Sequence, residues 1–380
     1  MSARSVFGIA CLFLLTLASS CSNEYDHQPY VYPTAGQAPP NLPVAPYDYF
    51  GTQNPQANKI ATLGRVLFYE KALSSNSKVS CGSCHKQGNS FADNKQFSNG
   101  FVGKPTARNS MPIQNLTMAD NGDGNTVNIA SGYGSASPVH LGGFFWDGRE
   151  SNLVKMVTMP VTNMDEMGNT DVGTAVTRVL RQTYYDQLFR DAFPNSTLSK
   201  DQEVAQALAT FLSSIKTTNT KFDRARLSFT DLEKQGMKLF YDQYNCNSCH
   251  QIDASQQVSP KFANIGLGNY ESDKGLFLIT ADANDRGKFR VPSLHNIELT
   301  APYMHDGSLA TLEQVLDHYS YGISNDPNLH PDLREAGGNA KQLNISASEA
   351  EALIAFLKTL TDKSVITDPR FSDPFPRSNQ

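Results

Sequence analysis

The chain has 380 residues, which is enough for two domains or one large one. Its 32 basic and 37 acidic residues give a net charge of −5, so the chain lacks the excess of positive charge typical of proteins that bind nucleic acid or anionic membranes. A hydrophobic content of 39% allows sizeable cores and argues against a wholly disordered chain.

Residues 1–20 have the pattern of an export signal. Arg4 precedes the apolar run FGIACLFLLTLASS, which is too short to span a bilayer comfortably. ASSC at 18–21 resembles a bacterial lipobox, so we expect cleavage before Cys21 and lipidation of that residue; the alternative is a plain secreted protein. The Pro-rich stretch 21–48 would then tether a periplasm-facing body to a membrane.

The next segments contain one pattern twice. GRVLFY at 64–69 precedes CGSCH at 81–85, and GMKLFY at 236–241 precedes CNSCH at 246–250. The only other cysteines lie within the first 21 residues. The repeated order indicates that the chain contains two copies of one structural unit.

A second repeated pattern follows each motif. ALATFLSSI at 207–215 and ALIAFLKTL at 352–360 both have the apolar spacing of an amphipathic helix. Each is preceded by a capping-box sequence that marks a helix start. The capping pairs are Ser199 with Gln202 and Ser346 with Glu349.

These patterns predict a mostly α protein with two cytochrome c-like domains, each with a covalent haem and long loops. The predicted domains span 49–220 and 221–366, with a polar boundary near 216–228 and a tail at 367–380. Long segments rich in Gly, Asn and Asp, such as 121–138, are usually functional or wrapped around something.

Cys-x-x-Cys pairs occur in several kinds of site. The His that follows each pair helps to distinguish between these kinds. A thioredoxin-type redox pair requires a βαβ context, which neither motif has. A disulfide between such close neighbours would stabilise little, and a four-thiolate zinc site would leave both His residues unused. Covalent haem uses every residue, because the thiols form thioethers and the His ligates the iron. The expected attachment residues are Cys81, Cys84, His85, Cys246, Cys249 and His250.

Over about residues 50–370 the chain resembles the bacterial di-haem cytochrome c peroxidase superfamily, which includes the methylamine-utilisation protein MauG. The resemblance rests on several motifs in a fixed order. They are CGSCH, ARNSMP (107–112), FFWDGRE (144–150), DEM (165–167), CNSCH, VPSLHNIELTAPYMHDGSLATLEQV (291–315) and DHY (317–319).

The resemblance implies roles for individual residues. His85 would hold the haem that reacts with peroxide, and Glu166 would be the acid–base residue above it. Pro160 matches the small residue that overhangs the same site, and Trp146 matches the aromatic bridge between the haems. Trp146 is the only Trp of the chain.

The resemblance also implies a calcium ion between the haems. Asn109, Thr300 and Pro302 match the positions that ligate it, and their oxygen atoms suit a hard cation. His305 is either a hydrogen-bond donor that supports the site or a structural residue. The other histidines are predicted to be structural (His295 and His318) or have no predicted role (His27, His140 and His330).

Two positions depart from the peroxidase pattern. Where typical members have a His that caps the reactive haem, this chain has Phe101, so that haem is predicted to be open without activation. Where they have a Met ligand at the second haem, this chain has Tyr319, as in MauG. Met304 and Tyr321 are nearby alternatives as ligands.

Three functions fit these expectations. The first is a peroxidase that reduces hydrogen peroxide to water with electrons from a small redox protein, such as a cytochrome c or a cupredoxin. The second is a MauG-like oxidase that modifies a residue of a partner protein. The third is a non-catalytic dihaem electron-transfer cytochrome, against which Glu166 argues, since an electron carrier does not need an acid–base group over an open iron. The first two require the same active site, and the sequence alone does not separate them.

Overall fold

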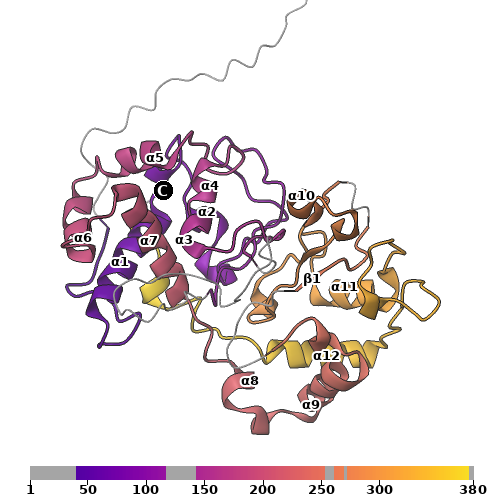
Figure 1. Ribbon diagram of the computed structural model, residues 1–380. Coiled ribbons are helices and arrows are strands. Elements are labelled where there is room, and N and C mark those ends of the chain that lie inside the picture. The colour runs from indigo at the N-terminus through magenta and orange to yellow at the C-terminus, as the bar shows by residue number, and fades with distance from the viewer. Residues whose placement is uncertain (1–39, 117–142, 253–260, 269–271, 376–380) are drawn as a thin grey trace, which may run out of the picture. The chain divides into compact units, whose positions relative to one another are not determined.

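The computed structural model describes residues 40–116, 143–252, 261–268 and 272–375 (Figure 1). The predicted signal, the segment 121–138, His27 and His140 lie outside these residues, as does most of the predicted tether. The described residues are mostly helical, which confirms the predicted class, and their one sheet pairs β1 (Phe262–Ala263) with β2 (Phe289–Arg290) in antiparallel order. The α-helices are α1 Pro55–Tyr69, α2 Cys81–Cys84, α3 Leu153–Met156, α4 Met159–Thr162, α5 Val172–Val179, α6 Tyr184–Ala192, α7 Lys200–Ser214, α8 Lys221–Arg224, α9 Asp231–Lys238, α10 Phe277–Thr280, α11 Leu312–Asp317 and α12 Ala347–Lys358.

The first copies of the two repeated patterns, GRVLFY and ALATFLSSI, form the helix pair α1 and α7. These helices lie side by side in Figure 1. The pair crosses at Gly64, where an added Cβ would lie 1.9 Å from the Ala207 carbonyl oxygen and 2.8 Å from the Phe211 Cβ. Only glycine allows the two backbones to approach this closely. Helix α7 begins at the predicted capping box of Ser199 and Gln202, which is thereby confirmed.

The second copies of the two patterns form an equivalent pair, α9 and α12. Here a Cβ on Gly236 would lie 1.9 Å from the Ala352 carbonyl oxygen and 2.8 Å from the Phe356 Cβ. These are the distances found at Gly64, so the two crossings are alike in contact as well as in sequence. The capping box of Ser346 and Glu349 at the start of α12 is also confirmed.

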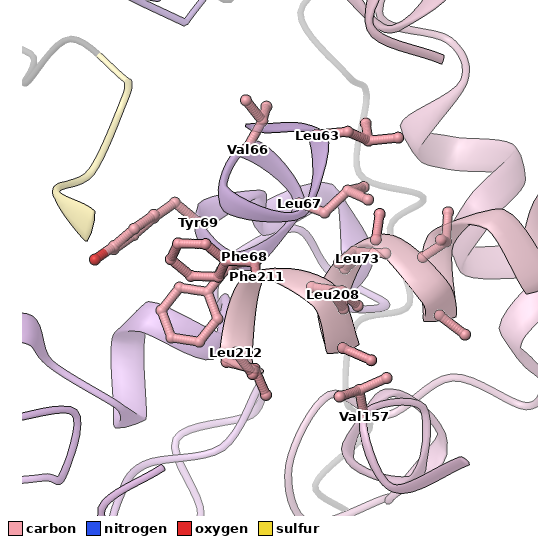
Figure 2. Close-up of a cluster of buried hydrophobic side chains, with 14 of the residues drawn as sticks. Leu63, Val66, Leu67, Phe68, Tyr69, Leu73, Val157, Leu208, Phe211 and Leu212 are labelled. Carbon is pink, nitrogen blue, oxygen red and sulfur yellow. The ribbon is translucent and has the colours of Figure 1, made fainter. Parts of the chain in front are cut away.

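Each helix pair carries its own hydrophobic core. Figure 2 shows the first, in which Leu67 and Phe68 of α1 meet Leu208 and Phe211 of α7. The second core is a separate cluster of side chains centred on α12 and on the π-helical turn Leu239–Gln243 that continues α9, with Phe356 fully buried within it. Two cores in one chain agree with the predicted duplication.

The C-terminal segment, predicted as a tail from 367, packs against the first core. Phe371 is only 3% exposed, and its carbonyl oxygen accepts a hydrogen bond of 2.7 Å from the Tyr69 hydroxyl. The Arg65 Nε donates to the Ser372 carbonyl oxygen at 2.7 Å. The chain thus returns to its first core after completing the second. Within the described residues, no helix is both long and apolar enough to cross a bilayer.

Candidate active site

The first Cys-x-x-Cys-His motif forms α2, and its two cysteines are half-buried free thiols. The Nδ1 of His85 lies 3.0 Å from the Phe91 carbonyl oxygen. Phe91 has φ +60°, a strained conformation for a bulky residue, and this conformation holds its carbonyl in place. Since Nδ1 faces an acceptor, it carries the proton, and Nε2 is left with the lone pair that a metal requires.

The second motif begins in the short 3₁₀ turn Cys246–Ser248 and repeats this arrangement. The Nδ1 of His250 lies 3.1 Å from the Pro292 carbonyl oxygen. Burial lowers the pKa of both His85 and His250, which favours the neutral imidazole that binds metals. Both histidines are therefore oriented and protonated as iron ligands should be.

A cavity of about 620 Å³ opens beside the second motif. Cys246, Cys249 and His250 line it, and its volume falls within the roughly 300–1,000 Å³ of sites for small organic ligands. Arg290 also lines this cavity and is only 6% exposed. Its Nε donates a hydrogen bond of 3.2 Å to the Phe145 carbonyl oxygen. Burial lowers the pKa of Arg290 to about 10, and no carboxylate among the described residues offsets this cost.

Tyr319 lies in a π-helical turn, His318–Gly322, and lines the same cavity. Burial raises its pKa, and the nearby Cys246 and Cys249 thiols raise it further, which shows how close the ring lies to the motif. Met304 lines the cavity as well, whereas Tyr321 is 68% exposed and does not. The structure thus leaves Tyr319 and Met304 as candidate second-haem ligands.

Glu166 lies in the turn that follows α4, the helix that contains Pro160. Burial raises the pKa of its carboxyl group, the positive charge of Arg149 lowers it, and Asp165 raises it again. Burial also raises the pKa of Cys81 to about 12, and the charge of Glu166 contributes to that shift. Glu166 is therefore within electrostatic range of the first motif, as its predicted role requires.

Phe101 packs directly on this turn. Its backbone N–H donates to the Glu166 carbonyl oxygen at 2.8 Å, and its ring lies 2.3 Å from the position that a Cβ on Gly168 would occupy. The Lys104 Nζ forms an ion pair of 2.6 Å with the Asp165 carboxylate. The segment around Phe101 is thus fastened to the turn that contains Glu166, and the Phe101 side chain has no ligand atom for an iron.

Trp146 is 9% exposed and lines the cavity beside the second motif. Its indole Nε1 donates to the Asn109 carbonyl oxygen at 2.9 Å, and its own carbonyl oxygen accepts from the Arg290 N–H at 2.8 Å. Its ring meets His305 edge-on at 6.5 Å between centroids, and His305 stacks on Phe289 at 3.6 Å. Trp146 therefore contacts segments that are far apart in the sequence, and its role as an aromatic bridge stays a prediction.

The three predicted calcium ligands, Asn109, Thr300 and Pro302, also line this cavity. The Asn109 Nδ2 donates to the carbonyl oxygens of Lys95 and Gln96 at 3.1 and 3.2 Å. This leaves the side-chain oxygen of Asn109 as its available ligand atom. The structure shows that all three line one cavity, and their binding of calcium stays a prediction.

Comparison with known proteins identifies the family. The family model described as di-haem cytochrome c peroxidase matches residues 58–228. A methylamine utilization protein MauG from Methylorubrum extorquens is 32% identical over 324 residues, which cover 83% of this chain and 82% of that protein. The chain belongs to the di-haem cytochrome c peroxidase family.

Other family members include peroxidases as well as MauG proteins. A cytochrome c551 peroxidase from Nitrosomonas europaea is 29% identical over 342 residues, with 87% of each chain covered. The crystal structure of a MauG-like protein associated with microbial copper homeostasis is 32% identical, has a TM-score of 0.68, and covers 92% of this chain and 99% of that one. The resemblance to the family is thus confirmed, and this di-haem family member is an oxidoreductase.

Two c-type haems are the cofactors of this family, and the residues present fit them. Each His directly follows a pair of cysteines with free thiols in the sequence, and both second-motif cysteines line one cavity. A haem carries carboxylate groups, so the buried cation of Arg290 suits a haem better than it suits an empty or apolar site.

Sequence reasoning missed several polar residues near these sites. Arg290 directly precedes a quoted motif, but a single Arg carries no sign of burial. The bidentate pair of Arg108 with Asp273, at 2.6 and 2.8 Å, joins residues far apart in sequence. The Cys249 thiol lies within 4.8 Å of ligand atoms of His330 and Asp332, a group that could hold a metal ion. Thioether formation at Cys249 would remove the thiolate from that group.

Proposed function

We propose that this chain is a MauG-like oxidase, which uses hydrogen peroxide to oxidise a residue of a partner protein. The observation that carries the proposal is that Tyr319 lines the cavity beside the second motif, near Cys246 and Cys249. A phenolate is a strong donor that stabilises high oxidation states of iron, whereas a Met thioether raises the reduction potential. Burial opposes ionisation of this phenol, so the iron itself would have to provide the positive charge that stabilises the phenolate.

Phe101 supports the same proposal. A gated peroxidase keeps its reactive haem capped by a His until half-reduction, but the segment around Phe101 is fastened to the Glu166 turn by the Phe101 N–H and by Lys104. Peroxide could then bind at the first site in the fully oxidised protein. Two oxidising equivalents could be held across both sites and withdrawn through protein.

A haem held by Cys81, Cys84 and His85 would supply the iron for cleavage of the O–O bond of peroxide. Glu166 takes the proton from one oxygen of hydrogen peroxide and returns it to the other, which leaves as water. Its partial burial limits the solvent that can compete for that proton. Trp146 lines the cavity beside the second motif and provides an aromatic path for electrons between the two haem sites.

The partner is proposed from chemistry and similarity. The 32% identity to a MauG-like protein associated with microbial copper homeostasis makes a copper-handling protein a candidate substrate. An exported, lipid-anchored location on Cys21 would restrict the partner to proteins outside the cytoplasm. Peroxide reduction with electrons from a small redox protein is the second candidate, and it uses the same residues.

The optical spectrum of the ferric holoprotein tests the proposal. One equivalent of hydrogen peroxide without reductant should change the features of both haems at once. In Tyr319→Met the first haem should still react, and the change at the second should be lost, because a thioether stabilises high oxidation states less well. Met304→Leu is the matched control and should behave as the wild type. A protein that reacts only after half-reduction would contradict the proposal and favour a gated peroxidase.

A further inference from the structure

Asn163 lies three residues before Glu166, and its side-chain Nδ2 donates to the Glu166 Oε1 at 2.8 Å. We propose that Asn163 is the positioning residue of the acid–base group: it holds Oε1 as an acceptor and leaves Oε2 to move the proton. This inference rests on the proposed role of Glu166 and adds the device that sets its geometry.

The orientation of the Asn163 amide is fixed by the turn itself. Its Oδ1 accepts the Asp165 N–H at 2.8 Å, so the NH₂ group must point the other way, toward Glu166. The Asn163 carbonyl oxygen accepts the N–H groups of Met167 and Gly168 at 3.1 and 2.8 Å. One residue thus shapes the turn and directs its carboxylate.

The far side of the turn is held independently. The Phe101 N–H donates to the Glu166 carbonyl oxygen at 2.8 Å, and the Lys104–Asp165 ion pair spans the exposed edge. With the backbone fixed from both sides, the carboxylate can still rotate about its side-chain bonds. The hydrogen bond from Asn163 opposes that rotation, because a carboxylate turned away from the amide would lose this donor.

The same hydrogen bond affects the proton affinity of Glu166. A donor to the ionised carboxylate favours that form, which opposes the effect of burial on the pKa of Glu166. The titratable and charged groups near Glu166 are Arg149 and Asp165 with its partner Lys104. The nearby thiols of Cys81 and Cys84 become uncharged thioethers once the haem is attached. All of these remain when Asn163 alone is changed, so a shift in that variant reports on the amide.

The test is the pH dependence of the peroxide reaction in the ferric holoenzyme. Asn163→Ser keeps a side-chain oxygen for the Asp165 N–H but lacks the amide donor. The acid limb of the pH–rate profile of Asn163→Ser should move to higher pH, because loss of the donor disfavours the ionised form of Glu166. Its maximal rate should fall roughly 10- to 100-fold, as for loss of a hydrogen bond to a charged group. Asn163→Asp keeps the size and adds a like charge, so its limb should move further in the same direction.

Asn152→Ser is the matched control. Asn152 caps α3 by accepting the Lys155 N–H at 3.1 Å, so the same substitution removes an amide from a capping residue that does not contact Glu166. Its acid limb and its Soret band should match the wild type. An Asn163→Ser protein with an altered Soret band or a lower cyanide affinity would indicate a general structural role and overturn the inference.

Glu166→Gln separates the inference from the function on which it rests. If Glu166→Gln reacts like the wild type, the proposed role of Glu166 fails and the inference fails with it. If Glu166→Gln loses the acid limb but both Asn163 variants keep the wild-type limb and rate, the function stands and the inference is overturned. Should Asn163→Ser not fold, Asn163→Asp provides the same readout.

Discussion

Arg149 lies in the same segment as Trp146, and its charge acts on Glu166. Its Nη1 lies 2.9 Å from the Asp147 Oδ2, and its guanidinium lies 3.8 Å from the centre of the Phe145 ring. Among the charged groups that affect Glu166, it is the one that lowers the pKa against the effect of burial. The cation of Arg149, three residues after Trp146, therefore opposes the effect of burial and favours the ionised form of Glu166.

Replacing Arg149 by Gln should raise the pKa of Glu166 further, because the favourable charge is lost and burial remains. A base that must be ionised becomes less available at low pH, so the acid limb of the peroxide reaction should move to higher pH. The alkaline plateau should change much less. Arg190→Gln removes an exposed Arg on α6 and is the control. A limb that moves to lower pH, or does not move, would contradict this electrostatic role.

At the scale of elements, the two glycine crossings are the most specific feature of the fold. Alanine at Gly64 or Gly236 would place its Cβ 1.9 Å from a backbone oxygen of the facing helix. Neither backbone can yield without separating the core that each pair forms. Each substitution should lower the free energy of unfolding by about 1–3 kcal/mol, the usual cost of overpacking, or more where the helices must separate.

Denaturant unfolding followed by circular dichroism measures this effect. Gly337→Ala is the matched control, because an added Cβ there meets no atom within 4 Å. It should leave stability nearly unchanged or raise it slightly. Equal midpoints for Gly64→Ala and Gly337→Ala would show that the α1–α7 crossing tolerates a methyl group, which would contradict the close approach described here.

The elements with local signals could be predicted, and those that depend on distant contacts could not. The capping boxes at Ser199 and Ser346 and the matched G-x-x-L-F-Y segments each lie within a short stretch, so their pattern was readable. The cation of Arg290 and the amide of Asn163 acquire their meaning from groups that only the fold brings close. The wall position of Tyr319 depends on a π-helical turn, which has no local sequence rule.

At the scale of the whole chain, the C-terminal segment links the end of the sequence to the first site. Val365 and Phe371 are buried in the first core, although the chain has by then passed through the second. The sequence predicted a tail from 367 and assigned Val365 to the domain 221–366, because a few apolar residues without periodicity do not indicate where they pack. The Phe371 ring lies 6.2 Å from that of Phe91, whose carbonyl oxygen faces the Nδ1 of His85.

Phe371→Ala should therefore affect both stability and the first site. Loss of a buried Phe side chain should cost about 3–5 kcal/mol. Because Phe371 supports Phe91, the hydrogen bond to His85 should loosen, and the spectrum of the first haem should change more than that of the second. Phe229→Ala is the comparison, since Phe229 is 4% exposed in the second core and should cost a similar amount without this spectral effect. If both variants lose stability and neither changes the first haem, the C-terminal segment stabilises the fold but does not hold His85.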